Sequence, residues 1–233
     1  MKKSITCIGV LMSFILSICA DHALAQDAPI MALDPTLMAG WSGNLAYSNK
    51  WGGKSSSANK SNFPYKSSTE LRQSVVAGFT KRLQSQSPKG AQAVLSAFGP
   101  GKADYGTLYA QMLKTSALHD NDAADALAGL ILVGYQIVNN VSDEKVTPTM
   151  ERAARAQVAS ILTKNNKLNS TTTRARAAEE IKLQTVVMAL GLQETLRNNT
   201  VGAYRKTIAN AYQGQYHINL SQLELTDKGF KKK

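Results

Sequence analysis

Apolar residues recur at helical spacing over most of the chain after residue 66. Between Leu71 and Leu83 an apolar side chain occupies every fourth position, and the preceding Ser67-Ser68-Thr69-Glu70 has the spacing of a capping box. Pro88 and Pro148 each begin a further apolar pattern, at a position where helices favour proline. These signals predict helices over about 67–86, 88–98, 103–113, 123–135, 147–162, 174–197 and 200–214.

The stretch from Ala126 to Tyr135 is apolar at nearly every position. A helix without a polar face belongs at the centre of a bundle. Gly129 and Gly134 would each cost about 1 kcal/mol in an exposed helix, so we expect neighbouring helices to approach the backbone closely there. We therefore predict an all-α fold, a bundle of about six or seven helices around this central apolar helix.

Two stretches interrupt the helical pattern in the C-terminal half. Residues 164–173 are polar and link two helices, and residues 216–230 mix apolar and polar side chains before three final lysines at 231–233. We expect residues 216–230 to lie extended over the bundle, because no run has the pattern of a convincing strand. The helical domain is predicted to span residues 67–230, with 231–233 as a basic tail.

Residues 26–66 show little helical or strand periodicity. Ser, Gly, Asn and Lys dominate positions 48–61, a composition that buries too little apolar area to offset chain entropy. We therefore expect a disordered or loosely packed N-terminal arm.

The arm also carries aromatic and basic residues in alternation. Its candidate binding residues are Trp41, Lys50, Trp51, Lys54 and Lys60. The pattern is typical of sites where rings stack on bases or sugars while cations hold a charged backbone. The alternative is that these rings, with Phe63 and Tyr65, anchor the arm on the helical body by burial.

The first 25 residues have the pattern of an export signal. Lys2 and Lys3 precede an apolar run over residues 5–20, and Ala23-Leu24-Ala25 before Gln26 places small residues two apart. We expect cleavage after Ala25 and a periplasmic or secreted location. The mature chain is expected to lack a transmembrane segment, since no later apolar run reaches the length of about 20 residues that a span needs.

Both cysteines, Cys7 and Cys19, lie within this signal. After cleavage no thiol remains for a disulfide, a thiolate metal site or a cysteine nucleophile. Lipidation of Cys19 is the alternative to cleavage after Ala25. It is disfavoured because Ile18 is branched and bulky where a lipoprotein signal has Gly or Ala.

Removal of residues 1–25 leaves 25 basic and 15 acidic residues, a formal charge of +10. Such a charge favours anionic partners such as envelope lipid headgroups, acidic polysaccharide or nucleic acid. We expect an anionic envelope component or a protein partner, and not nucleic acid. The alternative is that the charge only keeps the chain soluble.

The strongest polar cluster consists of His119, Asp120, Asp122 and Asp125. Asp122 and Asp125 lie three apart and share a helix face, where two carboxylates suit general acid–base work or a hard cation. The alternative for Asp120 and Asp122 is to cap the central helix. Asp125 lies inside that helix and needs a partner, for which the candidates are Arg152, Arg155, Arg174 and Arg176.

The sequence does not match the other catalytic patterns. His119 and His217 are the only histidines after residue 25, so neither a three-histidine zinc site nor a histidine pair at i,i+4 is available. Glu179 and Glu180 are adjacent and point roughly 100° apart, which does not make a glycosidase pair. We expect no metal site and no cofactor.

Three short motifs carry a resemblance: Asn121-Asp122-Ala123-Ala124-Asp125-Ala126, Arg155-Ala156-Gln157, and Leu225-Thr226-Asp227-Lys228-Gly229-Phe230. In this order after an export signal, they resemble a group of uncharacterised exported bacterial helical proteins classed as a domain of unknown function. The resemblance covers about residues 62–230 and implies an exported helical domain. It implies no activity, cofactor or catalytic residue.

The leading hypothesis is an exported non-enzymatic helical protein that binds an anionic envelope component or a protein partner through its arm and helix faces. The alternative is a hydrolase of envelope polymer, with His119, Asp122 and Asp125 at its site.

Overall fold

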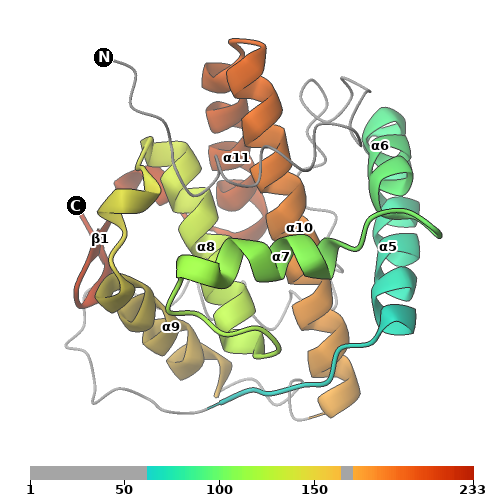
Figure 1. Ribbon diagram of the computed structural model, residues 1–233. Coiled ribbons are helices and arrows are strands. Elements are labelled where there is room, and N and C mark those ends of the chain that lie inside the picture. The colour runs from blue at the N-terminus through green and yellow to red at the C-terminus, as the bar shows by residue number, and fades with distance from the viewer. Residues whose placement is uncertain (1–61, 164–169) are drawn as a thin grey trace.

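The structure is a computed structural model and describes residues 62–163 and 170–233 (Figure 1). The expected export signal and the candidate binding residues from Trp41 to Lys60 lie outside the described residues. The elements are, in chain order, α5 (Thr69–Gln84), α6 (Pro88–Phe98), α7 (Tyr105–Met112), η1 (Leu113–Thr115), α8 (Ala123–Asn139), η2 (Asp143–Lys145), α9 (Pro148–Leu162), α10 (Thr171–Arg197), α11 (Val201–Tyr216), η4 (Leu220–Gln222), β1 (Leu223–Thr226) and β2 (Gly229–Lys232). The described residues thus form seven α-helices and a small hairpin, which confirms the predicted all-α bundle.

Side-chain caps start most of these helices close to the predicted positions. The cap of α5 is Ser68, one residue after the expected Ser67, and its hydroxyl accepts from the Leu71 amide at 3.2 Å. Thr147 caps α9 in the same way, with Pro148 in the first turn. α10 begins at Thr171, three residues earlier than expected, because Ser170 supplies its cap.

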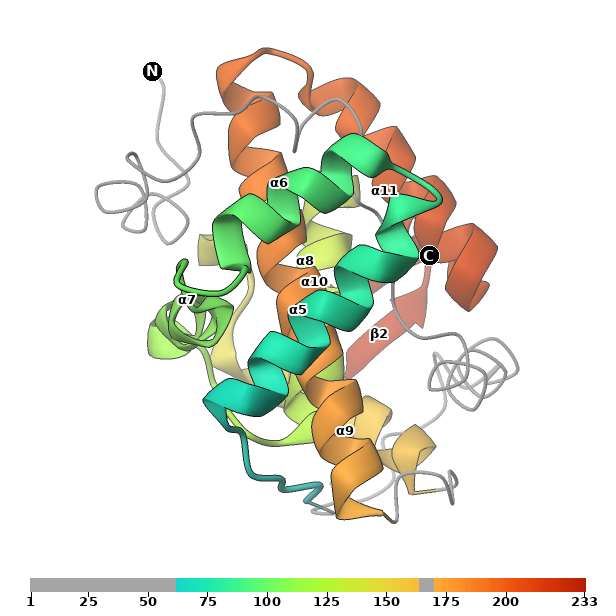
Figure 2. The same ribbon diagram turned by 90° about the vertical axis from the view of Figure 1, so that its right-hand side faces the viewer.

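α8 lies at the centre of the bundle, as its apolar pattern predicts (Figures 1 and 2). From Ala126 to Tyr135 every residue is buried except Val133, which is half-buried. α10 packs along α8 and also contacts α5, α7 and α11, while α9 packs on the other side of α8. α5 and α6 pair with each other and cover one side of α10 (Figure 2). The bundle therefore has two central helices.

The burial of α10 is not evident in its sequence. Every residue from Ala177 to Gln193 is buried, although this stretch includes Glu179, Glu180 and Lys182. Such residues are almost never fully buried unless they are paired. Their partners form part of the site described below.

Close approaches occur at both glycines of the central helix. A Cβ built on Gly134 would lie 2.5 Å from the ring of Tyr212 in α11, and the hydroxyl of that tyrosine donates to the Leu130 carbonyl. A Cβ on Gly129 would lie 3.2 Å from the hydroxyl of Tyr109 in α7. The absence of a side chain at these positions lets two tyrosines reach the backbone of α8.

The C-terminal segment is a β-hairpin, so the expectation of an extended segment without strands is wrong. β1 and β2 pair antiparallel from Leu223↔Lys232 to Thr226↔Gly229, and the expected basic tail thereby supplies half of β2. Strands of four residues are too short to give a clear alternating pattern. Gly229 has a φ of +94° at the turn, a conformation that glycine adopts without strain.

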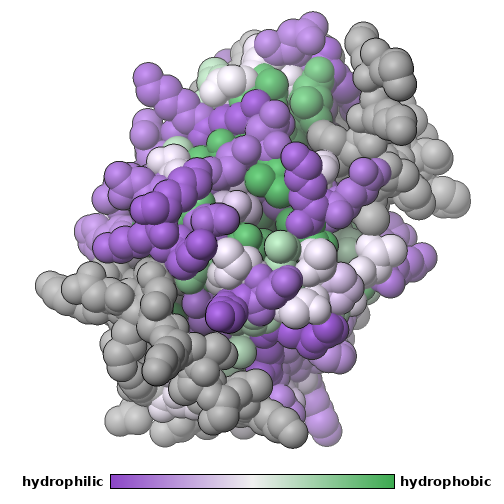
Figure 3. Space-filling model, turned by 90° about the vertical axis from the view of Figure 1, so that its left-hand side faces the viewer, coloured by the Kyte–Doolittle hydropathy of each residue, from purple (hydrophilic) through white to green (hydrophobic). Residues whose placement is uncertain are grey.

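The hairpin is held on α9 by one side chain. Gln157 accepts from the Phe230 amide at 2.7 Å and donates to the Phe230 carbonyl at 2.9 Å. The ring of Phe230 is buried and meets Tyr135 of α8 edge-on, with centroids 5.4 Å apart. The face on which α9 and the hairpin lie is mainly hydrophilic, with hydrophobic residues in small separate areas (Figure 3).

The last residues of the predicted arm pack on the helical body. The Tyr65 amide donates to the Asn121 carbonyl, and the Phe63 carbonyl accepts from the Ala123 amide, each at 3.0 Å. Tyr65 is only 6% exposed. For this aromatic residue, burial on the bundle agrees with the alternative that rings anchor the arm.

Candidate functional site

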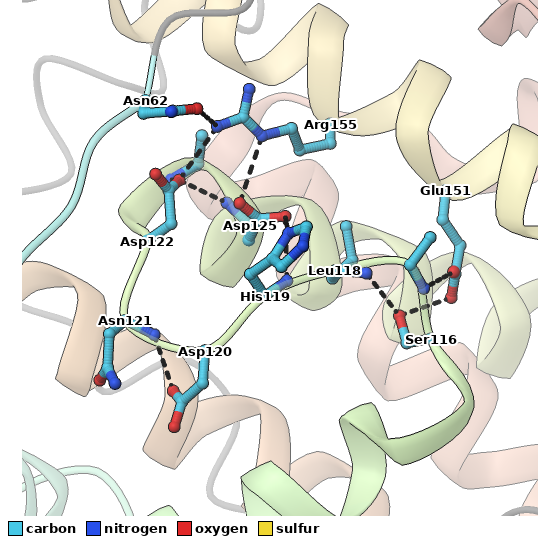
Figure 4. Close-up of polar contacts among 12 residues, drawn as sticks. Asn62, Ser116, Leu118, His119, Asp120, Asn121, Asp122, Asp125, Glu151 and Arg155 are labelled. Carbon is cyan, nitrogen blue, oxygen red and sulfur yellow. Dashed lines mark hydrogen bonds and ion pairs between the residues drawn. The ribbon is translucent and has the colours of Figure 1, made fainter.

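Asp122 caps α8, as one of the two sequence interpretations proposes (Figure 4). Its Oδ1 accepts from the amides of Ala124 at 2.9 Å and Asp125 at 3.2 Å, and its Oδ2 accepts from the Phe63 amide at 2.6 Å. Three backbone donors thus hold this carboxylate, which fixes the start of the central helix against residues 62–65.

Asp125 finds its partner in Arg155 of α9, one of the four arginines considered. The Arg155 Nε donates to Asp125 Oδ2 at 3.2 Å, and its Nη2 donates to Asp122 Oδ1 at 3.4 Å (Figure 4). The Asp125 side chain is 3% exposed, and this burial raises the pKa of its carboxyl. The charge of Asp122 also raises this pKa. The charge of Arg155 lowers it, but by less than burial and Asp122 together raise it.

The histidines do not complete a catalytic arrangement with these carboxylates. The His119 side chain is 84% exposed, and its Nδ1 lies 3.8 Å from Asp125 Oδ1, beyond hydrogen-bond distance. Its backbone amide is the group that donates to Asp125. His217 caps the C-terminus of α11 and is exposed. In residues 62–163 and 170–233, no group of three or more His, Cys, Asp or Glu side chains is arranged to hold a metal ion.

A second polar cluster, which the sequence analysis missed, lies around Glu179 of α10. This carboxylate is fully buried and accepts from the hydroxyls of Tyr65 at 2.9 Å and Tyr105 at 2.8 Å. Lys182 is 1% exposed and donates to Glu179 at 2.9 Å and to Asp120 at 2.6 Å. Burial and the charge of Glu179 raise the pKa of both phenols, so they stay protonated and donate.

Glu180 points away from this cluster to other partners. It accepts from Arg82 of α5 at 2.9 Å and lies 3.5 Å from Arg176, one turn earlier in α10. The spacings Arg176–Glu180 and Glu179–Lys182 are those of ordinary surface ion pairs. No signal in the sequence shows that Glu179, Glu180 and Lys182 are buried.

Tyr109 is the third buried tyrosine near this cluster, and it differs from the other two. It is 1% exposed, and its ring centroid lies 5.3 Å from the Lys182 Nζ. Among the described residues its hydroxyl has no hydrogen-bond partner. Burial raises the pKa of this phenol above its usual value, so the hydroxyl stays protonated.

Tyr109 also lines a cavity of about 280 Å³ between α7, α8 and α10. The walls are mainly apolar and include Leu108 and Met112 of α7, Leu132 and Ile137 of α8, and Val186 and Leu190 of α10. Leu108 and Met112 are only half-buried. Leu196, which is 36% exposed, also lines the cavity and is one of two large apolar residues exposed in the described part. Thr115, Asn140 and Glu144 are exposed lining residues too, so the cavity reaches the surface.

Several polar side chains that line the cavity form hydrogen bonds with one another. Gln136 donates to Asp143 of η2 at 2.7 Å, and Glu151 of α9 accepts from the Ser116 hydroxyl at 2.8 Å. Arg205 of α11 donates from Nη2 to Asn140, whereas its buried Nε has no hydrogen-bond partner among the described residues. These contacts fix η2 and the residue after η1 beside the cavity.

The three motifs that carry the family resemblance contact one another in the fold. Arg155 binds Asp122 and Asp125, and Gln157 binds the backbone of Phe230.

None of the helices in the described part combines the length and apolarity of a membrane span. Comparison of the chain with protein-family models, with curated proteins and with solved structures finds no match. The resemblance to an exported family of unknown function therefore stays a prediction.

Proposed function

We propose that this chain is an exported, non-catalytic binding protein whose helical body holds a small, mainly apolar molecule in the cavity between α7, α8 and α10. The observation that carries the proposal is the cavity itself. Its volume of about 280 Å³ lies near the lower end of the range for small-molecule pockets, roughly 300–1,000 Å³. Apolar side chains that line a cavity of this size have no protein packing partner on that side, and an apolar ligand would supply one.

The state of the acidic residues supports binding in preference to hydrolysis. A hydrolytic carboxylate must exchange a proton with substrate or water. Asp122 is instead held by three amides, and Asp125 is bound to Arg155. The exposed ring of His119 lies beyond hydrogen-bond distance of Asp125. This geometry favours a role for these residues in helix packing.

Export and the contact with an anionic envelope component remain parts of the proposal that rest on residues 1–61. They are supported by the signal pattern and by the charge of +10 that remains without residues 1–25. Deletion of residues 26–61 is expected to reduce retention on isolated envelopes, most clearly at low salt. Retention that stays unchanged and insensitive to salt would exclude a role for the arm.

Binding in the cavity is tested with N-phenyl-1-naphthylamine, a neutral probe that fluoresces in apolar surroundings. Ala189 of α10 is buried and lines the cavity, so Ala189→Phe fills the space with a ring. Ala110 is exposed on α7 and lies outside the lining, so Ala110→Phe is the matched control.

We expect the unaltered chain and Ala110→Phe to bind the probe equally, and Ala189→Phe to lose binding while keeping its helical circular dichroism. Equal binding by all three proteins would place the probe elsewhere and overturn the proposal.

A further inference from the structure

The charged residues of the cavity wall indicate which charge its ligand carries. The carboxylates of Asp143, Glu144 and Glu151 line the cavity, against the single guanidinium of Arg205. The wall is therefore net negative, although the chain has a formal net charge of +11. We infer that the ligand is a small amphiphile with an apolar body and one ammonium group, which lies beside these carboxylates. This inference rests on the proposed function, since it names the ligand class of the same cavity.

Two of these carboxylates have no cationic partner in the described part of the chain. Asp143 accepts from the side-chain amide of Gln136 at 2.7 Å. Glu151 accepts from the Ser116 hydroxyl at 2.8 Å and from the Ala117 amide (Figure 4). All three donors are neutral, so the negative charge of both carboxylates is not compensated.

Most other carboxylates in the described part are paired with a cation. Those that lie within ion-pair distance of an arginine or a lysine are Asp104, Asp120, Asp122, Asp125, Glu179, Glu180, Glu194 and Glu224. Asp143 and Glu151 depart from this pattern, and both line the cavity. An ammonium group on the ligand would supply the missing positive charge.

The three carboxylates come from one short stretch of the chain that reaches the surface. Asp143 and Glu144 belong to η2, and Glu151 lies in the first turn of α9. Glu144 is exposed, whereas Asp143 and Glu151 are half-buried. An ammonium group placed here keeps contact with water while the apolar body of the same molecule is buried. The cost of burying an isolated charge is thereby avoided.

Helix ends add to the negative potential at the cavity. The lining residues of α7, α8 and α10 belong to the C-terminal halves of these helices, and Met112, Ile137 and Leu196 lie in their last turns. A helix C-terminus carries about half a negative charge, because its last carbonyls have no partner within the helix. α9 has its first turn at the cavity instead, through Glu151. Three C-terminal ends against one N-terminal turn favour a cation.

The test compares three naphthalenes of similar size by titration calorimetry on the full chain. At pH 7, 2-naphthylmethylammonium is cationic, 2-naphthoate is anionic and 2-naphthol is neutral. We expect the unaltered protein to bind the ammonium at least about fivefold more tightly than the carboxylate. This preference should shrink as salt is added, because ions screen charges near the surface.

Asp143→Asn tests the contribution of one carboxylate, since it removes a charge and keeps an oxygen that can accept from Gln136. Asp227→Asn is the matched control, because Asp227 is exposed in the hairpin turn and lies outside the lining. We expect Asp143→Asn to reduce the preference for the ammonium over the carboxylate about threefold, and Asp227→Asn to leave it unchanged. Both variants should bind 2-naphthol as the unaltered protein does, which shows that the cavity is intact.

The neutral probe separates failure of this inference from failure of the proposed function. If 2-naphthol binds but 2-naphthoate binds the unaltered protein as tightly as the ammonium, the inference is wrong while the cavity remains a binding site. The same conclusion follows if Asp143→Asn and Asp227→Asn change the preference equally. If none of the three probes binds the unaltered protein, the proposed function fails as well.

Discussion

Phenylalanine substitutions at Tyr105 and Tyr109 provide a sharp stability test of the buried polar cluster. Both residues lie on α7, one turn apart, and both are 1% exposed. The same atom is removed in each variant, so loss of volume and apolar contact is matched. The variants differ in what the removed hydroxyl binds.

The partners of the two hydroxyls determine how much each substitution should change the free energy of unfolding. The Tyr105 hydroxyl donates to Glu179 Oε2 at 2.8 Å, and the loss of a hydrogen bond to a buried charged group costs about 1.5–3 kcal/mol. Tyr109→Phe removes a hydroxyl that has no partner among the described residues. Its free energy of unfolding should be unchanged or higher by up to about 1 kcal/mol, because an unpaired polar group is no longer buried.

Urea unfolding at pH 7, followed by circular dichroism, measures both changes in the ligand-free protein. The slopes of the transitions should agree among the variants, so that the midpoints report stability alone. A loss in Tyr109→Phe as large as that in Tyr105→Phe would show that Tyr109 has a partner in the folded protein. The reasoning about an unpaired phenol would then be refuted.

Three further predictions concern the hairpin, the carboxyl group of Asp125 and the N-terminus. Gln157→Leu removes both bonds to the Phe230 backbone and should lower the free energy of unfolding by about 1–2 kcal/mol in urea titrations; an unchanged midpoint would contradict the docking role. Because the pKa of Asp125 is raised, the folded state binds its proton more tightly than the unfolded state, so this carboxyl's contribution to stability falls as pH rises from 3.8 through the raised value. The stability of the unaltered protein minus that of Asp125→Asn should therefore fall over this window, and a rise would contradict the assignment. Mass spectrometry of exported protein should find Gln26 as the first residue, whereas a lipid-modified Cys19 or an uncleaved chain would contradict cleavage after Ala25.

The sequence predicts the central helix α8 because the residues of the helix itself show that it is buried. From Ala126 to Tyr135 no polar face is present, and oxygen-bearing side chains such as Asp122 stand where a cap is required. The ion pair of Asp125 was expected for the same reason, since a carboxylate inside an apolar helix needs a partner. The choice of Arg155 among four arginines required the fold.

The polar stretch of α10 could not be recognised as buried from sequence. Glu179 and Lys182 lie three apart, as on many exposed helices. Their burial is decided by Tyr65 and Tyr105, which are 114 and 74 residues away in the chain. Such distant partners leave no local pattern.

The cavity is equally absent from the sequence pattern. Leu132, Val186 and the other apolar lining residues occupy core positions that would look the same in a filled interior. The cavity arises from how α7, α8 and α10 pack against one another. Tyr109 likewise has the spacing of a core aromatic residue, and its missing partner becomes visible only in three dimensions.

The central claim, that the cavity between α7, α8 and α10 binds a small molecule, is tested most directly by a crystal structure of the chain with 2-naphthol. The account predicts electron density for one naphthol in this cavity. Density for the probe at another site, with the cavity empty at saturating concentration, would contradict it.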